Sequence, residues 1–293
     1  RAWWILEKAG VPHSVVPGNH DLGPRGESAS YDRFFPPSTY EGEPWYGGYM
    51  GDPTDEVPDP EDRGNRDSYQ TFSANGVDLL VLNLEIDLPP SSIAWAGDVI
   101  DAHPDHQVIV VTHRWLRQDG VRWRIPLYDE RVSSAPEDVW EQLIEPRCNV
   151  VLVLTGHDAG EAHRVDENSC GRPVFQLLAD YQRRPRGGDG WLRTITFDSA
   201  ASMMRVDTYS VTRNAFEIDA NSRFTLPWAG AGAPFVALGR DLDVTSGKMS
   251  SWRWLDLEPG GAYEWFAIAD DGALATVGMT RRFSTPVEEA VTW

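Results

Sequence analysis

Three histidines stand just past short apolar runs of the chain. His20 follows the run at 14–17, His113 follows the run at 108–112, and His157 follows the run at 150–155. Asn19 and Asp21 flank the first of these histidines. Imidazole nitrogens, and the amide oxygen of asparagine as a neutral ligand, suit divalent transition metals. These residue types therefore predict a metal site, provided that the fold brings the three loops together.

The elements around the histidines predict such a convergence. Buried strands are expected at 13–16, 77–84, 107–112 and 149–155 because these runs are short, apolar and rich in β-branched residues. Helices are expected between them, at 1–9, about 91–102 and about 136–145, which is an α/β pattern. In an open α/β sheet, ligands bind beyond the carboxyl ends of the strands. Gly18 and Gly156 are expected to let the chain turn sharply there.

The motifs at these strand ends resemble those of calcineurin-like metallophosphoesterases. Gly18-Asn-His-Asp21 is similar to the family's GNH(D/E) motif, Val110-Val-Thr-His113 to its strand-ending histidine, and Thr155-Gly-His157 to the start of its GHxH motif. The resemblance covers roughly residues 1–226. It implies a four-layer α/β/β/α sandwich and a dinuclear centre of divalent transition metals such as Mn, Fe or Zn.

The same resemblance implies a role for each residue. Asn19, His113 and His157 would ligate the second metal. His20 would be the general acid beside the leaving-group oxygen, and Asp21 would accept its other ring proton. A metal-bound hydroxide would then hydrolyse a phosphate monoester or diester.

The chain departs from the family pattern at the first metal. The motifs Asp-x-His and GDxxD supply ligands to that metal, and neither occurs before Gly18. The GHxH motif ends in Ala159 where the family has histidine, and His163 is expected at the rim. The first-metal site is therefore expected to be incomplete. The alternative function is a degenerate phosphoesterase fold that binds a ligand or partner without turnover.

The rest of the chain is expected to be rich in strands. Strands without intervening helices are predicted at 174–179, 192–197, 203–210, 215–218 and 224–226, which indicates a second sheet. The aromatic-containing segment 34–66 is interpreted as a long loop that packs as a lid. Residues 227–234 are interpreted as a linker. Residues 235–286 resemble part of a fibronectin type III or immunoglobulin-like module, with strands around the Pro259-Gly260 turn and at 281–285.

The net charge of −19 excludes broad attraction to nucleic acid or anionic lipid, and favours a small phosphate-ester substrate held through bound metal. No run is long and apolar enough for a membrane span. The chain is expected to begin upstream of Arg1, and its composition suggests a secreted protein. The 13 tryptophans leave a carbohydrate-binding array as a third possibility.

Several polar residues and both cysteines leave two interpretations open. Cys148 and Cys170 form either a disulfide or two buried thiols. Asp180-Tyr-Gln182 and the arginines after it either line the mouth of the site or form a solvated loop. His13, His103 and His106 lack ligand spacing and are interpreted as ordinary surface residues.

Overall fold

A mixed seven-stranded sheet forms the centre of the molecule. The computed structural model describes residues 4–23, 27–52, 61–129, 131–230, 232–270 and 275–287. The sheet has the strand order β1-β2-β3-β4-β5-β7-β6, in which β3, β4, β5 and β7 are parallel and the other pairs are antiparallel. Its strands are β1 Tyr46–Met50, β2 Gly64–Ala74, β3 Val77–Leu84, β4 Gln107–Thr112, β5 Val150–Thr155, β6 Gly160–Glu167 and β7 Pro173–Asp180.

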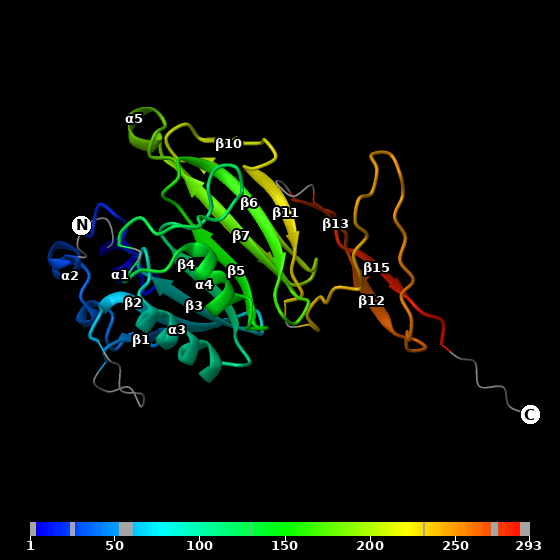
Figure 1. The fold of residues 1–293 in the computed structure, drawn as a ribbon, viewed down its shortest axis with the longest axis horizontal. Coiled ribbons are helices and arrows are strands. Elements are labelled where there is room, and N and C mark those ends of the chain that lie inside the picture. Colours follow the sequence, from blue (N-terminus) through cyan, green and yellow to red (C-terminus); the bar gives the residue numbers. More distant parts are fainter. Residues whose placement is uncertain are drawn as a thin grey trace, which may run out of the picture.

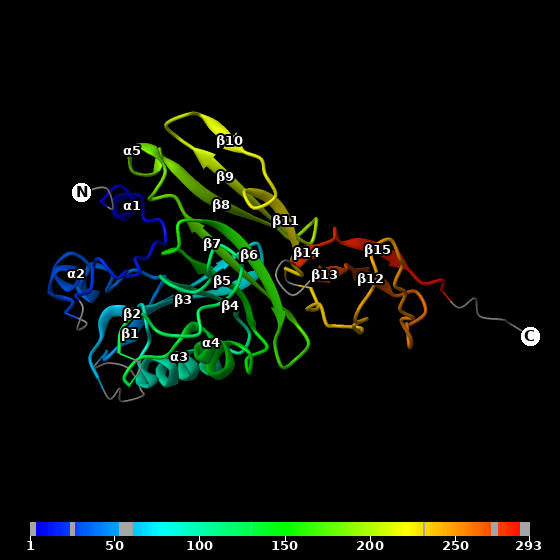
Figure 2. The ribbon, with the colours of Figure 1, turned by 45° about the horizontal axis from the view of Figure 1, so that its top comes forward.

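A smaller antiparallel sheet covers one face of the large sheet, and helices cover the other (Figures 1 and 2). In the smaller sheet β9 pairs with β8, β10 and β11. Its strands are β8 Trp191–Asp198, β9 Met203–Ser210, β10 Ala215–Glu217 and β11 Arg223–Pro227. The helical elements of the described residues are α1 Trp4–Ala9, α2 Ala29–Phe34, η1 Pro37–Thr39, α3 Pro90–Ala102, α4 Pro136–Val139, η2 Trp140–Ile144 and α5 Pro185–Gly188.

Two apolar clusters hold these layers together, and β3 contributes to both. Leu80, Leu82 and Leu84 pack with α3 and η2 on one face, whereas Val77 and Leu79 pack toward the smaller sheet. Successive side chains of a strand point to opposite faces, so a strand buried on both faces reads as a continuous apolar run. This burial explains why β3, β4, β5 and β7 could be recognised as strands from the sequence. The assignment of 174–179 to the second sheet is wrong, because β7 pairs in parallel with β5 in the large sheet.

The expected four-layer α/β/β/α sandwich is wrong. The structure is mostly β, with 34% of the described residues in strands and 15% in helices. Among the described residues, the outer face of the smaller sheet carries no helix layer: along β8 the side chains alternate between half-buried and exposed, and Leu192 is 38% exposed. A sheet face that meets water needs no helix to cover it, and the polar residues alternating with Ile195 and Phe197 make that exposure tolerable.

The N-terminal third also differs from the expectation. Residues 13–16 form no strand, because their backbone pairs with no sheet; the Tyr31 hydroxyl donates to the Val15 carbonyl oxygen instead. The predicted loop at 34–66 contains η1, all of β1 and the start of β2, although residues 53–60 lie outside the described part. Residues 1–3 of the expected first helix also lie outside it.

Where a sandwich-like segment was expected, the described residues of the tail form two separate two-stranded ladders. β12 Ala262–Trp265 pairs with β15 Arg281–Ser284, and β13 Ile268–Asp270 pairs with β14 Ala275–Val277. The alternating residues 251–258 form no strand, because alternation creates a strand only where a partner backbone is present. Figure 2 shows these ladders to one side of the two packed sheets. Ile268 and Val277 pack against the cluster between the sheets.

Two covalent or polar ties join distant parts of the chain. Cys148 and Cys170 form a disulfide with a Cα–Cα distance of 5.5 Å, which links the start of β5 to the turn between β6 and β7. In the expected linker, Trp228 is buried and its indole Nε1 donates to Gln107 Oε1 at 2.6 Å. The linker therefore begins anchored to the sheet.

Over the described residues, every helix is too short or too polar to cross a bilayer.

Candidate metal site

The side chains of Asn19, His113 and His157 meet at one end of the large sheet. His113 directly follows β4 and His157 follows β5 by two residues, and these strands are parallel neighbours with Val111 opposite Leu154. Asn19 lies in a turn in which the N–H groups of Asp21 and Leu22 both donate to the Gly18 carbonyl oxygen. The convergence expected for the carboxyl ends of neighbouring strands is therefore present in the structure.

The three potential ligand atoms form a small triangle. His113 Nε2 lies 2.9 Å from Asn19 Oδ1, His157 Nδ1 lies 3.2 Å from Asn19 Oδ1, and the two ring nitrogens are 3.0 Å apart. Ligand atoms bound about 2.1 Å from one ion, at angles between square and tetrahedral, are separated by about 3.0–3.4 Å. The spacing of the triangle therefore fits three ligands on one face of a single transition-metal ion.

Backbone contacts hold the two histidine loops against each other. The Thr155 hydroxyl and the Gly156 N–H both donate to the His113 carbonyl oxygen, each at 3.1 Å. His157 itself adopts the left-handed conformation with φ of 71°, which a non-glycine residue rarely does. The sharp turn after β5 is therefore made at His157, and the expectation that Gly156 makes it is wrong.

Gly18 allows the closest approach to the site. A Cβ atom at this position would lie 2.8 Å from His113 Cε1, 2.9 Å from Nδ1 and 3.0 Å from Nε2. The backbone of residue 18 therefore lies against the imidazole, and any side chain would push the ring away. Gly156 is different, because a Cβ there would meet only carbonyl oxygens at 3.8 and 3.9 Å.

The environment keeps both imidazoles neutral. Burial, with a smaller contribution from the neighbouring His157, lowers the pKa of His113 to about 4, although the charges of Asp180 and Asp21 act in the opposite direction. Burial also lowers the pKa of His157. A neutral imidazole carries the free lone pair that a metal requires, so both rings are ready ligands at neutral pH.

His20 and Asp21 lie at the solvent side of the cluster. Both residues are exposed. The Asp21 carboxylate accepts the Gly18 N–H at 2.9 Å, and so closes the turn that presents Asn19. Within the described residues the structure gives no His20–Asp21 hydrogen bond, so the paired arrangement implied by the family resemblance is not formed here.

The remaining predicted positions do not join the triangle. Ala159 offers no ligand atom, and the His163 ring stacks on Phe224 of the smaller sheet, with ring centroids 4.5 Å apart. Nothing at these two positions completes a second metal site. The three ligand atoms gathered here are spaced for one ion, and the dinuclear centre implied by the family resemblance stays a prediction.

The loop after β7 is held by ion pairs. Arg184 pairs with Glu217 and Glu161, and Arg186 pairs with Asp189. Gln182 donates through Nε2 to the His157 carbonyl oxygen at 3.2 Å and to Asp180 Oδ2 at 2.7 Å. The loop therefore lies beside the triangle, which agrees with the interpretation that it lines the mouth of the site. The charges of Arg184 and Arg186, however, are already paired with carboxylates.

Sequence reasoning missed Tyr128. Its hydroxyl lies 3.5 Å from the Asn19 carbonyl oxygen, and its backbone N–H donates to Asp87 Oδ2 at 2.6 Å. The residue belongs to an irregular loop with no motif, so the sequence offers no feature that would have singled it out.

A second group of possible metal ligands lies where β6 of the large sheet meets β10 of the smaller sheet. Glu161, Glu217 and Asp219 bring carboxylate oxygens within 4.8 Å of one another. Burial alone would raise the pKa of Glu161, but hydrogen bonds from Ser222, Thr208 and Tyr181, with the charge of Arg193, lower it overall. The Glu161 carboxylate is thus satisfied by protein donors, and these contacts explain the group without a metal.

Comparison with known proteins finds one long but partial match. The chain is similar to the uncharacterized protein YvnB of Bacillus subtilis strain 168, with 30% identity over 298 aligned residues. The alignment covers 92% of this chain and 21% of YvnB, so the chain spans 21% of that relative's length. No family model matches the chain.

Proposed function

We propose that this chain contributes the metal-binding and acid-catalytic residues of a metal-dependent phosphate-ester hydrolase. The observation that supports the proposal is the triangle of Asn19 Oδ1, His113 Nε2 and His157 Nδ1, whose atoms lie 2.9–3.2 Å apart. The resemblance of residues 18–21, 110–113 and 155–157 to calcineurin-like phosphoesterase motifs supplies the reaction class. The substrate is a phosphate monoester or diester.

One divalent transition metal would be held by these three residues. Two imidazole nitrogens and one neutral amide oxygen suit Mn, Fe or Zn. When bound, such an ion supplies a Lewis acid that neutralises charge on a phosphoryl group. With a net charge of −19, the chain has little other means of attracting a phosphate, which favours a small substrate over a nucleic-acid polymer.

The protein's own residues would divide the remaining work. His20 follows Asn19 directly, is exposed, and lies close enough to His113 for its charge to lower the pKa of that ring, so we place the leaving group of a substrate at the triangle on the His20 side. His20 would donate a proton to the leaving-group oxygen. Asp21 would act through the backbone. Its carboxylate accepts a hydrogen bond from the Gly18 N–H, and this bond fixes the turn that orients Asn19 and His20.

The proposal is tested by metal titration and turnover together. Calorimetric titration with Mn²⁺ is expected to give one tightly held ion per chain, and His113→Ala is expected to abolish that binding. Hydrolysis of p-nitrophenyl phosphate and its bis-ester is then expected to fall about a hundredfold in His20→Ala. His106→Ala is the matched control, because His106 lies before the opposite end of β4. Metal binding with wild-type turnover in His20→Ala would refute the catalytic assignment.

Ala159 supports a second candidate, a phosphoesterase-like protein that binds a ligand without turnover. The histidine that ends the family's GHxH motif is absent at this position. In that case Mn²⁺ and inorganic phosphate still bind at the triangle, but hydrolysis of either ester stays at the level of His20→Ala.

We also propose that the protein works outside the cytosol. The Cys148–Cys170 disulfide supports this placement, because disulfides persist in oxidising compartments.

A further inference from the structure

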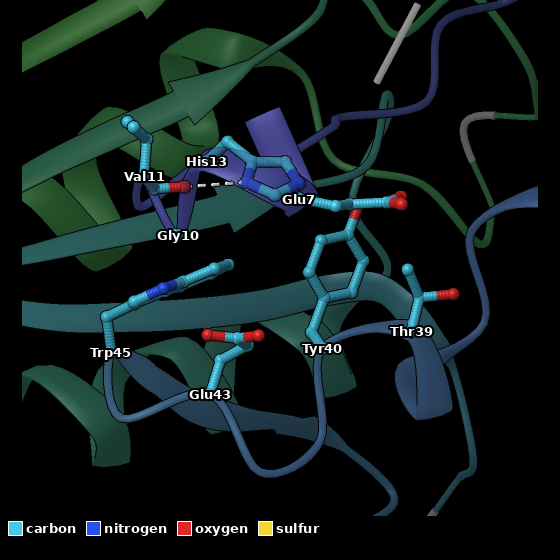
Figure 3. A pocket seen from close by; sticks show the side chains of 8 residues that line it. All are labelled: Glu7, Gly10, Val11, His13, Thr39, Tyr40, Glu43 and Trp45. Atoms are coloured by element: carbon cyan, nitrogen blue, oxygen red, sulfur yellow. Dashed lines mark hydrogen bonds between the residues drawn. The ribbon is translucent and has the colours of Figure 1, made fainter. Parts of the chain in front are cut away.

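A small cavity lies between the N-terminal segment and the start of β1, on residues that the metal site does not use. Its volume is about 80 Å³, which is room for several water molecules or one compact organic group. Figure 3 shows the side chains of His13, Tyr40 and Trp45 around it, with the carboxylates of Glu7 and Glu43 beside them. The cavity thus combines aromatic rings with negative charge.

The three rings are close enough to act on one ligand. Their centroids are 5.5 Å apart for His13 and Tyr40, 5.3 Å for His13 and Trp45, and 6.1 Å for Tyr40 and Trp45. A cation interacts favourably with an aromatic face within about 6 Å of its centroid. A single cation resting against Tyr40 and Trp45 can therefore lie within range of both of their rings, with the His13 ring beside it.

The charges around the cavity have one sign. Glu7 and Glu43 line it, and none of its lining residues is lysine or arginine. In the described part of the chain, neither carboxylate takes part in an ion pair. Burial together with the charge of Glu7 raises the pKa of Tyr40 to about 12, so its hydroxyl stays neutral at physiological pH. The site is therefore anionic and aromatic.

The cavity wall is fixed in place by the fold. Trp45 is 5% exposed, and its carbonyl oxygen accepts the Thr71 N–H of β2 at 2.9 Å. Tyr40 stacks on Tyr46 with a centroid distance of 5.6 Å, and the Tyr46 hydroxyl donates to Asn65 Oδ1. The rings are held before any ligand arrives, which lowers the entropic cost of binding.

We propose that this cavity binds a small organic ammonium cation of the choline type. A quaternary ammonium group spreads its charge over a compact apolar surface, which suits aromatic faces better than a strongly hydrated metal ion does. The two glutamates complete the charge balance. His13, which was interpreted from the sequence as an ordinary surface residue, is half-buried and lines this cavity.

The test compares two ligands of the same shape. Calorimetric titration of the chain with choline is expected to show saturable binding, and 3,3-dimethylbutan-1-ol, the neutral analogue, is expected to bind at least about tenfold more weakly. Equal binding of the two, or no binding of choline at tens of millimolar, would overturn the proposal.

Variants then locate the site. Glu43→Gln is expected to weaken choline binding about tenfold, because it removes one charge and keeps the side-chain size. Trp45→Phe keeps a ring and is expected to weaken binding about two- to fivefold. Glu41→Gln is the matched control, since Glu41 lies two residues away and outside the cavity lining. If Glu41→Gln and Glu43→Gln weaken binding equally, the effect is general electrostatics and the assignment fails.

Discussion

Replacing Gly18 by alanine tests whether the position of the His113 ring controls metal binding. The added Cβ would lie 2.8 Å from the ring, whereas an ordinary contact needs at least 3.4 Å. The ring must therefore retreat by about 0.6 Å (3.4 − 2.8 Å), or the backbone must move by the same amount. His113 Nε2 then leaves its present distances of 2.9 Å to Asn19 and 3.0 Å to His157.

The expected consequence is a loss of affinity with little loss of fold. A site must be held within about 0.5 Å of its productive geometry, so this displacement is expected to weaken Mn²⁺ binding about tenfold to a hundredfold. The assay is calorimetric titration, with a thermal melt of each metal-free variant to show that it is folded.

Gly156→Ala is the control, because its Cβ meets nothing closer than 3.8 Å and Gly156 needs no left-handed conformation. It is expected to bind Mn²⁺ within about twofold of the unmodified chain, since ordinary contacts cost little. Unchanged affinity in a folded Gly18→Ala variant would refute the reasoning, as would equal losses in both variants.

Three further results are expected from the structure. The pKa of His113 is lowered from 6.5 to about 4, so between these pH values the unfolded chain binds more protons than the native chain. The free energy of unfolding should therefore fall by up to about 3 kcal/mol as the pH drops from 6.5 to 4. Urea titrations of His113→Asn should not show this loss of stability. Reducing the Cys148–Cys170 disulfide, which spans 22 residues, should lower the free energy of unfolding by about 3 kcal/mol, seen as a lower urea midpoint; a Cys148→Ser/Cys170→Ser chain should be insensitive to reductant. Glu161→Gln should destabilise the fold by about 3 kcal/mol because it leaves the buried Arg193 unpaired, yet bind as much Mn²⁺ as the unmodified chain; lost metal would contradict the structural role given to Glu161.

Much of the large sheet could be predicted because its central strands are buried on both faces. Runs such as Val108–Val111 carry only apolar residues, and the helix at α3 begins from consecutive prolines. The missed strands are polar. In β2, Asn65, Asp67 and Gln70 are buried through hydrogen bonds to other elements, and in β6 Glu161 is buried by ion pairs. Such partners come from distant parts of the chain, so no local pattern marks these strands.

The candidate site shows the same division. Histidines that end neighbouring strands were expected to meet, and the positions of Asn19, His113 and His157 agree with that expectation. The left-handed turn at His157 and the contact of Gly18 with His113 could not be foreseen, because each depends on the packing of one loop against another. The four-layer arrangement came from the family resemblance, and the exposed outer face of β8 contradicts it.

Anomalous diffraction from crystals grown with Mn²⁺ tests the proposed metal site most directly. One peak is expected, about 2.0–2.3 Å from Asn19 Oδ1, His113 Nε2 and His157 Nδ1. Ordered side chains at these positions with no peak between them, or a peak confined to Glu161, Glu217 and Asp219, would contradict it.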